Sequence, residues 1–447
     1  MQKLYSISSE HNPFMDITPP SIFSHSTSSK RWSTPAQMEP IQSTNKPEPF
    51  DDDENEPNDT YQLAYVIHFL LGAGYLIPWN AFITAVDYFQ FLYPNKHINK
   101  VFSVGYMSAA VAVLLTLMCW STSSRIKLPS VRARMNIGQG LFISALMVAP
   151  VTDWIVHGKQ TGMVSNIAFV VLVSMVMISG LADGLVGGSL VGATGELPGR
   201  YMQAVFAGNA TAGLVVSILR IVTKASLPHT QQGLRTSTQI YFVFSALIIL
   251  LCVICTNVLH RLPMIRYYRN RKHNNNSHMS ISSNFWVVVK KIRWLVTAVF
   301  VTYVVSLSIF PGYLSENVKS DYFKDWYPII LITTFNVGDF LGKCLTAIYV
   351  PNGSKGTVWC CMARVLFYPL FMGCIHGPKW MHSEVPVVVL TLMLGVSNGY
   401  LTSVLMILAP KSVPIEEAEV VGIAMETGLV IGLVVGSAFG WLWNLEH

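Results

Sequence analysis

The chain has 447 residues, of which 51% are hydrophobic and only 12% charged, and its formal net charge is +6. Its mean hydropathy is +0.43, and apolar stretches of about 20 residues, the length that crosses a bilayer, recur along it. A soluble domain carries roughly twice this share of charged residues. The composition therefore excludes an ordinary soluble protein and predicts an all-α membrane protein.

Residues 1–60 are expected to form a disordered cytosolic tail. They are rich in Ser, Thr and Pro and carry an acidic run at 51–56, and such a segment buries too little apolar surface to fold. The tail lacks the apolar core of a secretory signal peptide. Its Ser-rich, acid-poor start leaves organelle targeting as an alternative to a phosphorylated cytosolic tail.

Hydropathy predicts eleven transmembrane helices. They lie near residues 62–88, 101–120, 137–157, 163–194, 202–223, 237–260, 294–315, 326–349, 358–376, 385–409 and 417–443. With the N-terminus cytosolic, fifteen Lys and Arg residues fall in cytosolic connections against eight outside, which agrees with the positive-inside rule. A basic cytosolic loop, 261–293, separates an N-terminal six-helix bundle, 61–260, from a C-terminal five-helix bundle, 294–447.

Proline and glycine recur at corresponding places in the two bundles. Pro78 is expected to break the first span and Pro311 the seventh, because proline removes a backbone hydrogen bond. Interrupted spans at matching positions of two halves point to a binding site between them. The fourth and tenth spans are rich in Gly and Ser, which predicts close helix approach.

Six charged residues fall deep within the apolar segments. They are Asp183, Arg220, Asp339, Lys343, Arg364 and Glu426. A charge at mid-membrane costs about 2.5 to 3.5 kcal/mol on insertion scales, so such residues are expected to be interior, paired and functional.

The eighth span carries the clearest motif, which begins at Phe335. Spacings of three and four residues place Asn336, Asp339 and Lys343 on one helical face, where the acid and the base can pair. A carboxylate and an ammonium group one turn apart can also hydrogen-bond the vicinal hydroxyls of a sugar. The alternative is a structural ion pair that locks two helices.

Further candidates lie in other spans. Trp79 can stack on a planar base while Asn80 reads its polar edge, although a membrane-anchoring Trp is the alternative. Arg364 is expected to pair with Asp183, Asp339 or Glu426 in a gate, and Arg220 is expected to snorkel to the outer surface. Glu426, Asp183 and His68 are candidate proton carriers, with structural ion pairing or packing as the alternatives.

Several segments resemble the equilibrative nucleoside transporter family, and most closely its plant branch. They are residues 76–84, 196–205 with Gly208, 325–328 leading into Phe335, Asn336 and Asp339, 363–371, and 395–400 with Asn398. The resemblance implies a major-facilitator-like fold of 6+5 bundles around a central cavity that opens alternately to either side. It also implies that Asp339 and Lys343 contact ribose and that Trp79 lines the cavity.

This sequence departs from the family pattern in two places. Lys343 stands where the family usually has Arg, and a lysine lacks the planar guanidinium fork. Gly187 stands where many members have a Gln that contacts the nucleobase, which leaves the purine or pyrimidine preference open. Members that favour organic cations have an acid in the fifth span, where this chain has Asn209.

The expected function is transport of nucleosides or nucleobases, facilitative or proton-coupled, through a multi-pass protein of the plasma membrane or, alternatively, of a vacuolar or other internal membrane. Organic cation or monoamine transport is the alternative. An intramembrane aspartyl protease with Asp183 and Asp339 as its dyad is a remote one. We expect no enzymatic activity, cofactor, metal or nucleic acid; the expected partners are the substrate, protons and the lipid bilayer. The seven cysteines, including the C-x-x-C at Cys252 and Cys255, are expected to pack in spans.

Overall fold

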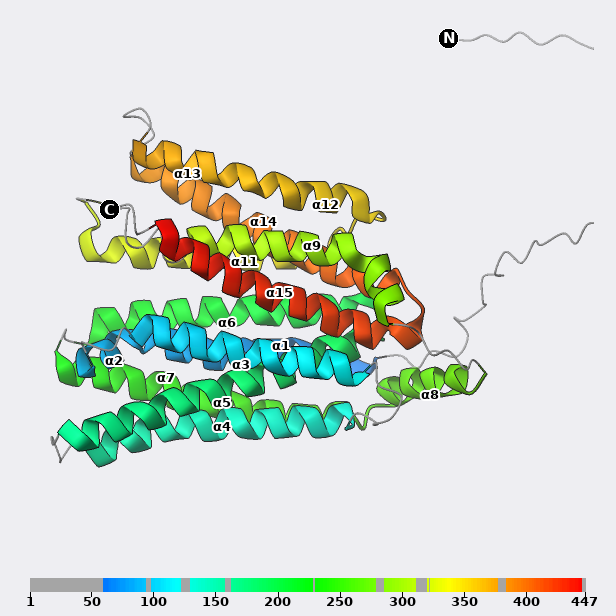
Figure 1. Ribbon diagram of the computed structural model, residues 1–447, viewed down its shortest axis with the longest axis horizontal. Coiled ribbons are helices and arrows are strands. Elements are labelled where there is room, and N and C mark those ends of the chain that lie inside the picture. The colour runs from blue at the N-terminus through cyan, green and yellow to red at the C-terminus, as the bar shows by residue number, and fades with distance from the viewer. Residues whose placement is uncertain are drawn as a thin grey trace, which may run out of the picture. The chain divides into compact units, whose positions relative to one another are not determined.

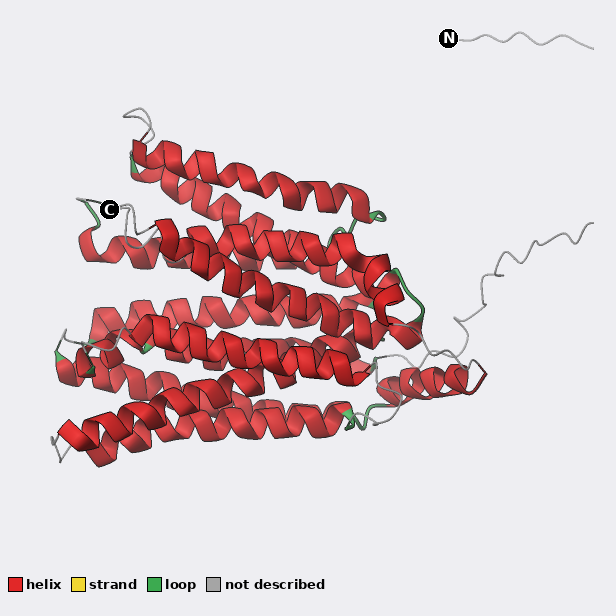
Figure 2. Cartoon of the chain, in the orientation of Figure 1, coloured by secondary structure: helices red, strands yellow, loops and turns green. Residues whose placement is uncertain are grey.

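In the computed structural model, the described residues are 59–93, 98–121, 129–156, 162–227, 230–278, 285–310, 320, 322–376 and 383–443. All of them belong to the unit Asn55–His447. These residues form helices joined by turns, with no strand among them (Figure 2). The predicted tail lies outside the described residues except for its last two positions.

The helices follow one another along the chain with short connections. They are η1 (Thr60–Gln62), α1 (Leu63–Thr84), α2 (Val86–Leu92), α3 (Ile98–Ser121), α4 (Val131–Val156), α5 (Gly162–Gly195), α6 (Gly199–Ser226), α7 (Gln231–Leu259), α8 (Pro263–His278), α9 (Phe285–Ile309), η2 (Lys324–Trp326), α11 (Tyr327–Leu345), α12 (Ser354–Ala363), η3 (Arg364–Leu366), α13 (Phe367–His376), α14 (Glu384–Lys411) and α15 (Ile415–Trp443).

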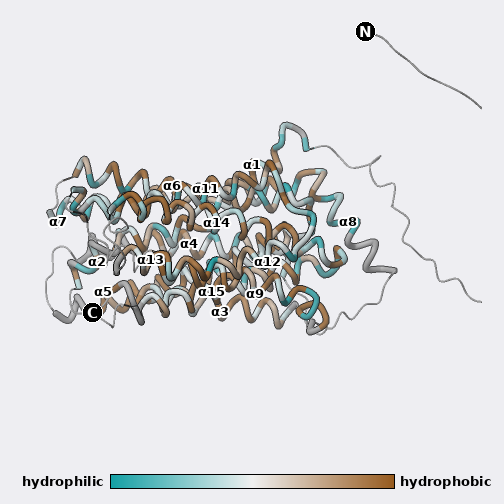
Figure 3. Tube along the Cα trace, turned by 90° about the horizontal axis from the view of Figure 1, so that it is seen from above, coloured by the Kyte–Doolittle hydropathy of each residue, from teal (hydrophilic) through white to brown (hydrophobic). Residues whose placement is uncertain are grey.

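The long helices lie side by side in two groups (Figure 1). Helices α1 to α7 pack mainly on one another and are called the N-terminal group; α9 and α11 to α15 form the C-terminal group. The groups meet where α15 packs on α3 and α5, and where α6 packs on α11 and α14. Hydrophobic residues cover most of the helix lengths (Figure 3), as a lipid environment requires.

Ten helical segments among the described residues are long and apolar enough to cross a membrane, one fewer than predicted. The predicted third span coincides with α4, which is 26 residues long but is not one of the ten. The span Ser354–Cys374 is divided into α12, η3 and α13. The segment expected to be only a loop, 261–293, contains helix α8 and the first residues of α9.

Pro78 does not end the first helix, so the predicted break there is wrong. Helix α1 continues through Pro78 to Thr84, and α2 begins two residues later. Proline within a helix costs one backbone hydrogen bond, a loss that neighbouring helices can offset in a membrane protein. The predicted break at Pro311 lies outside the described residues.

Glycines bring α11 and α14 close together, as the composition of the tenth span predicts. A Cβ atom at Gly342 would lie 2.2 Å from the carbonyl oxygen of Val396, and one at Gly399 would lie 2.1 Å from that of Asp339. Gly338 and Gly395 precede these residues by four positions, so each helix carries a Gly-x-x-x-Gly pattern. The two backbones therefore pack with almost no space between them.

Candidate functional site

The acid and the base of the eighth predicted span form a buried ion pair on α11. Lys343 Nζ lies 2.8 Å from Asp339 Oδ2, and the two residues are only 3% and 8% exposed. They are one helical turn apart, which allows both side chains to reach the same point.

A hydrogen-bonded network extends from this pair through three more helical segments. Asn398 of α14 donates from Nδ2 to Asp339 Oδ1 (2.7 Å), and its Oδ1 accepts from the hydroxyl of Ser306 on α9 (2.7 Å). Ser306 Oγ in turn accepts from Arg364 Nη2 (2.6 Å). We call Arg364, Ser306, Asn398, Asp339 and Lys343 the polar network.

Contrary to expectation, Arg364 forms no ion pair with Asp183, Asp339 or Glu426, all of which the structure describes. Its Nη1 donates to the Ser397 hydroxyl and to the Leu394 carbonyl oxygen, and its guanidinium lies 5.7 Å from the centroid of the Phe367 ring. Because it lies in the 3-10 turn between α12 and α13, its fork reaches hydroxyl and carbonyl acceptors on α9 and α14. Its connection to Asp339 runs through Ser306 and Asn398.

The remaining candidates on α11 face two different neighbours. Phe335 stacks on Phe310 with ring centroids 4.0 Å apart. Asn336 donates from Nδ2 to Ser217 Oγ (2.7 Å) and to the Gly213 carbonyl oxygen (3.3 Å). Both of these acceptors belong to α6, so Asn336 links the two helix groups.

Trp79 and Asn80 differ in how free they are to contact a ligand. The Trp79 ring lies 4.5 Å from that of Tyr106 on α3, tilted by 42°, and the side chain is half-buried. Asn80 donates from Nδ2 to the Leu76 carbonyl oxygen (3.0 Å). One hydrogen of its amide group is therefore already bound to the backbone of its own helix. The stacking role of Trp79 stays a prediction.

The two other buried acids each accept a hydrogen bond from a tyrosine. Tyr106 donates to Asp183 Oδ1 (2.9 Å), and Tyr75 of α1 donates to Glu426 Oε1 (2.7 Å) on α15. Asp183 and Glu426 lie close enough for their charges to interact, and Glu426 interacts in the same way with Lys343. We call Tyr75, Tyr106, Asp183 and Glu426 the acidic cluster; it adjoins the polar network.

Tyr75, Tyr106 and Ser306 are site residues that the sequence pattern does not predict. Neutral hydroxyl groups are common in apolar helices and carry no charge signal. Tyr75 lies four residues before Trp79, and this shared helical face was the one available indication of its position. Ser306 offered none.

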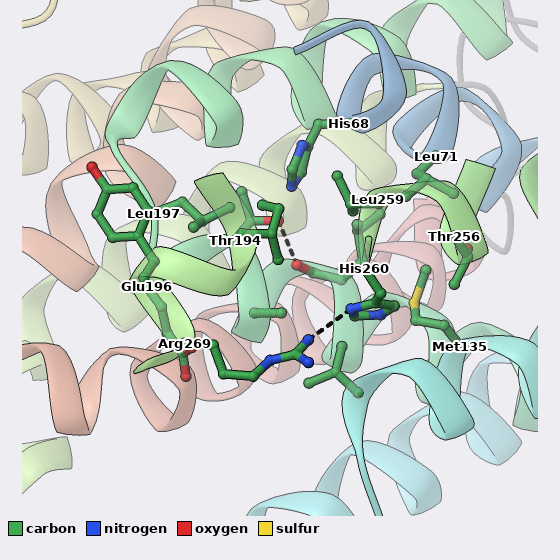
Figure 4. A pocket seen from close by; sticks show the side chains of 15 residues that line it. His68, Leu71, Met135, Thr194, Glu196, Leu197, Thr256, Leu259, His260 and Arg269 are labelled. Atoms are coloured by element: carbon green, nitrogen blue, oxygen red, sulfur yellow. Dashed lines mark hydrogen bonds between the residues drawn. The ribbon is translucent and has the colours of Figure 1, made fainter. Parts of the chain in front are cut away.

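His68 lies apart from the other candidates. Its Nδ1 is 2.7 Å from the Ala64 carbonyl oxygen, and its ring is 5.2 Å from that of Tyr201. It lines a pocket of about 80 Å³ toward the predicted cytosolic end, together with His260 and Arg269 (Figure 4). No other candidate residue lines this pocket.

His260, just beyond the end of α7, is held neutral in this pocket. Burial, with the nearby guanidinium groups of Arg269 and Arg132, lowers the pKa of His260 to about 4. A neutral imidazole can accept, and Arg269 Nη2 lies 2.7 Å from His260 Nδ1. This contact joins α8 to the end of α7.

At the predicted cytosolic end an ion pair joins the two helix groups. Arg134 Nη2 of α4 lies 2.5 Å from Glu419 Oε1 of α15. Nearby, a cavity of about 370 Å³ lies between α6 and the ends of α11 and α14, lined by Gln203, Thr346 and Lys411 among others.

Arg220 lines a different pocket with Lys224 near the opposite end of α6. No group of three metal-ligating side chains occurs among the described residues.

Comparisons with known proteins agree on one family. Residues 172–283 and 271–445 match the family described as "Nucleoside transporter". The chain is 52% identical to equilibrative nucleotide transporter 8 of Arabidopsis thaliana over 88% of this chain and 97% of that protein. It is 44% identical to equilibrative nucleotide transporter 1 of the same plant, over 87% of each chain, and 28% identical to human equilibrative nucleoside transporter 4, over 87% and 84%.

Solved structures with a similar fold belong to membrane transporters. A proton:xylose symporter of the major facilitator superfamily aligns with a TM-score of 0.59 at 12% identity, covering 87% of this chain and 90% of that one. A bacterial ferroportin homologue aligns equally well over 85% and 92%, also at 12% identity. The chain therefore has a major-facilitator-like fold and is a multi-pass membrane protein that belongs to the nucleoside transporter family.

Proposed function

We propose that this protein carries nucleosides across a membrane by alternating access, with the ribose bound at Asp339 and Lys343. The observation that supports this most strongly is the placement of that pair. A buried ion pair contributes little net stability, yet here it lies beside Asn398 in apolar surroundings. Carboxylate, ammonium and amide groups together can accept from and donate to the two ribose hydroxyls.

Charge balance favours nucleosides over nucleotides. Among the described residues, three buried carboxyl groups, those of Asp183, Asp339 and Glu426, lie in the polar network and the adjoining acidic cluster, and the ammonium group of Lys343 there is already paired. Arg364 donates to hydroxyl and carbonyl groups. A phosphate would bring further negative charge into this low-dielectric region, at a large desolvation cost.

The experiment is uptake by proteoliposomes that contain purified protein. Labelled adenosine, uridine, adenine and adenosine monophosphate are supplied in parallel, with the Asp339→Ala variant alongside. We expect nucleoside uptake at least about tenfold above that of the monophosphate, and its loss in the variant, since hydrogen bonds to charged groups are strong. Normal nucleoside uptake by a correctly inserted Asp339→Ala protein would overturn the assignment of the site.

The contacts within each helix group support alternating access with two moving bodies, the bundles 61–260 and 294–447. We infer that the cavity between α6 and the ends of α11 and α14 forms the cytosolic part of the substrate route. We assign the protein to the plasma membrane, with a vacuolar or other internal membrane as the alternative. A fluorescent fusion imaged together with markers of the plasma membrane and of internal membranes decides between them.

Proton coupling is supported by the acidic cluster. Asp183 and Glu426 share a buried region, and Tyr75 connects Glu426 to the opposite helix group. His68 lines a pocket that no residue of the cluster lines, and it is the weaker candidate. Uptake that is unchanged by a proton ionophore and by outer pH would leave a facilitative carrier.

A second candidate function, organic cation transport, is favoured by the two acids of the acidic cluster, Asp183 and Glu426. Two carboxyl groups close together can hold a protonated amine beside Trp79 and Tyr106, whose rings attract cations. Competition for adenosine uptake by low concentrations of a monoamine would support it.

A further inference from the structure

The acidic cluster lies where three helices of the N-terminal group face α15. Tyr75 and Trp79 are one turn apart on α1, and Asp183 and Gly187 are one turn apart on α5. A Cβ atom at Gly187 would lie 2.6 Å from the Tyr75 hydroxyl oxygen and 2.7 Å from two of its ring carbons. The absence of a side chain at Gly187 is therefore what allows the Tyr75 ring to lie across α5.

From this position Tyr75 reaches the opposite helix group. Its hydroxyl donates to Glu426 Oε1 at 2.7 Å, while Tyr106 donates to Asp183 Oδ1 at 2.9 Å. In this way both carboxyl groups accept hydrogen bonds from phenolic hydroxyls. These hydrogen bonds hold one oxygen of each carboxyl group in place. The second oxygen of each group is not bound by them.

Glu426 has an oxygen that remains without a partner. The side chain is 1% exposed, and Oε2 is a buried atom that forms no hydrogen bond in the described part of the chain. An unmatched buried oxygen is costly, so Oε2 is available to a donor that enters the site. Lys343, whose charge also acts on Glu426, is already paired with Asp339 at 2.8 Å.

We infer that the acidic cluster recognises the exocyclic amino group of the nucleobase, so that the carrier prefers adenosine and cytidine to inosine and uridine. This inference rests on the proposed function. With the ribose at Asp339 and Lys343, the base extends toward Glu426 and Asp183, and the half-buried Trp79 ring offers it a stacking surface.

The chemistry distinguishes the two kinds of base. When Glu426 is ionised, an amino group donates a hydrogen bond to its free oxygen, whereas an oxo group at the same position places its lone pairs against those of the carboxylate. A site built to accept from an N–H group rejects the analogue that lacks it. The selection acts on the amino group and not on ring size, so it applies to purines and pyrimidines alike.

The test compares matched substrates that differ mainly in this group. Initial rates of proteoliposome uptake are measured over a range of concentrations for adenosine and inosine, and for cytidine and uridine. We expect kcat/KM to be at least about tenfold higher for the amino member of each pair. Equal values within both pairs would overturn the inference and leave the proposed function intact, whereas no uptake of any of the four would overturn the proposed function.

Two nearly isosteric variants identify the group responsible. Glu426→Gln replaces one acceptor oxygen by an amide donor, and we expect the preference for amino bases to fall to about twofold or less. Tyr75→Phe removes the phenolic donor but leaves both carboxyl oxygens, so the preference is retained. An unchanged preference in Glu426→Gln, or its loss only in Tyr75→Phe, would show that Glu426 is not the recognising group. The wild-type comparison decides the base preference even if a variant fails to fold.

Discussion

At the residue scale, the pairing of Asp339 with Lys343 raises the question of whether the pair binds substrate or only joins helices. Breaking a buried pair leaves one unpaired charge and costs about 3 to 5 kcal/mol, whereas replacing both partners by neutral groups is often tolerated. We expect Asp339→Asn and Lys343→Met each to lower thermal stability in detergent. The double variant should recover most of that stability.

Measurements of nucleoside uptake by the same variants distinguish a substrate-binding role of the pair from a purely structural one. If the pair contacts ribose, the double variant remains inactive despite its recovered stability, because neither the carboxylate nor the ammonium group is restored. Recovery of nucleoside uptake together with stability would make the pair purely structural. The two measurements on one set of proteins therefore resolve the alternative left open by the sequence.

Ser306 provides a second prediction at this scale. Its hydroxyl accepts from Arg364 and donates to Asn398, so Ser306→Ala leaves two buried polar groups without this partner. We expect a loss of about 1 to 3 kcal/mol in stability and reduced uptake. Thr297→Ala, on the exposed side of the same helix, is the control and should change neither; equal effects of the two variants would contradict the importance of the polar network.

The sequence predicts local pairs better than long-range ones. The spacing of Asp339 and Lys343 indicates contact on one helix turn, and the structure contains that contact. The partners of Arg364 depend on how α9 and α14 pack around η3, and a single sequence carries no signal for that arrangement. The same holds for Tyr75, whose position depends on Gly187 of another helix.

At the scale of elements, the close packing of α11 and α14 is what brings Asn398 to Asp339. We expect Gly399→Ala to force these helices apart, since its Cβ would lie 2.1 Å from the Asp339 carbonyl oxygen. Overpacking of this kind costs about 1 to 3 kcal/mol, and uptake should fall with it. Gly356→Ala on α12, whose Cβ would have no neighbour within 4 Å, is the matched control, and a similar loss there would refute the explanation.

Helix α8 is held against the end of α7 by the contact between Arg269 and His260. This docking of α8 should depend on pH, because His260 can take up a proton. Its pKa is about 4 in the folded protein, below its usual value near 6.5. Undocking therefore takes up a proton, so the docked state is most stable above about pH 6.5 and loses stability as the pH falls toward 4. Hydrogen exchange of α8 amides, corrected for intrinsic rates, should rise between pH 7 and pH 5.

His260→Asn supplies the control for this prediction. Asparagine can still accept from Arg269 but does not titrate in this range. The increase in exchange should therefore disappear in the variant, and its persistence would place the cause elsewhere.

Hydropathy predicted the positions of most membrane-spanning helices, but the sequence did not predict which of these helices are interrupted. The predicted break at Pro78 failed because a proline within a packed helix loses one hydrogen bond without ending the helix. Conversely, the chain between α12 and α13 passes through a 3-10 turn at Arg364, where no glycine lies and the nearest proline, Pro369, is five residues further on. Both differences arise from tertiary packing.

At the scale of the whole molecule, contacts between the helix groups at the predicted cytosolic end should control which side opens. Arg134 and Glu419 lie 2.5 Å apart across the groups, and a Cβ at Gly422 would lie 2.7 Å from the Val191 carbonyl oxygen. A change that weakens only this end shifts the population toward the state that is open there.

We expect Arg134→Glu to widen the distance between spin labels attached at the exposed positions Ser130 and Ser412, because two acids then face each other. Adding Glu419→Arg re-forms an ion pair of opposite polarity and should restore the original distance distribution. Lys291→Glu is the matched control, since Lys291 pairs with Glu417 between α9 and α15 of the same helix group (3.3 Å). An equal widening in this control, or none in Arg134→Glu, would show that the Arg134 pair does not hold the two groups together.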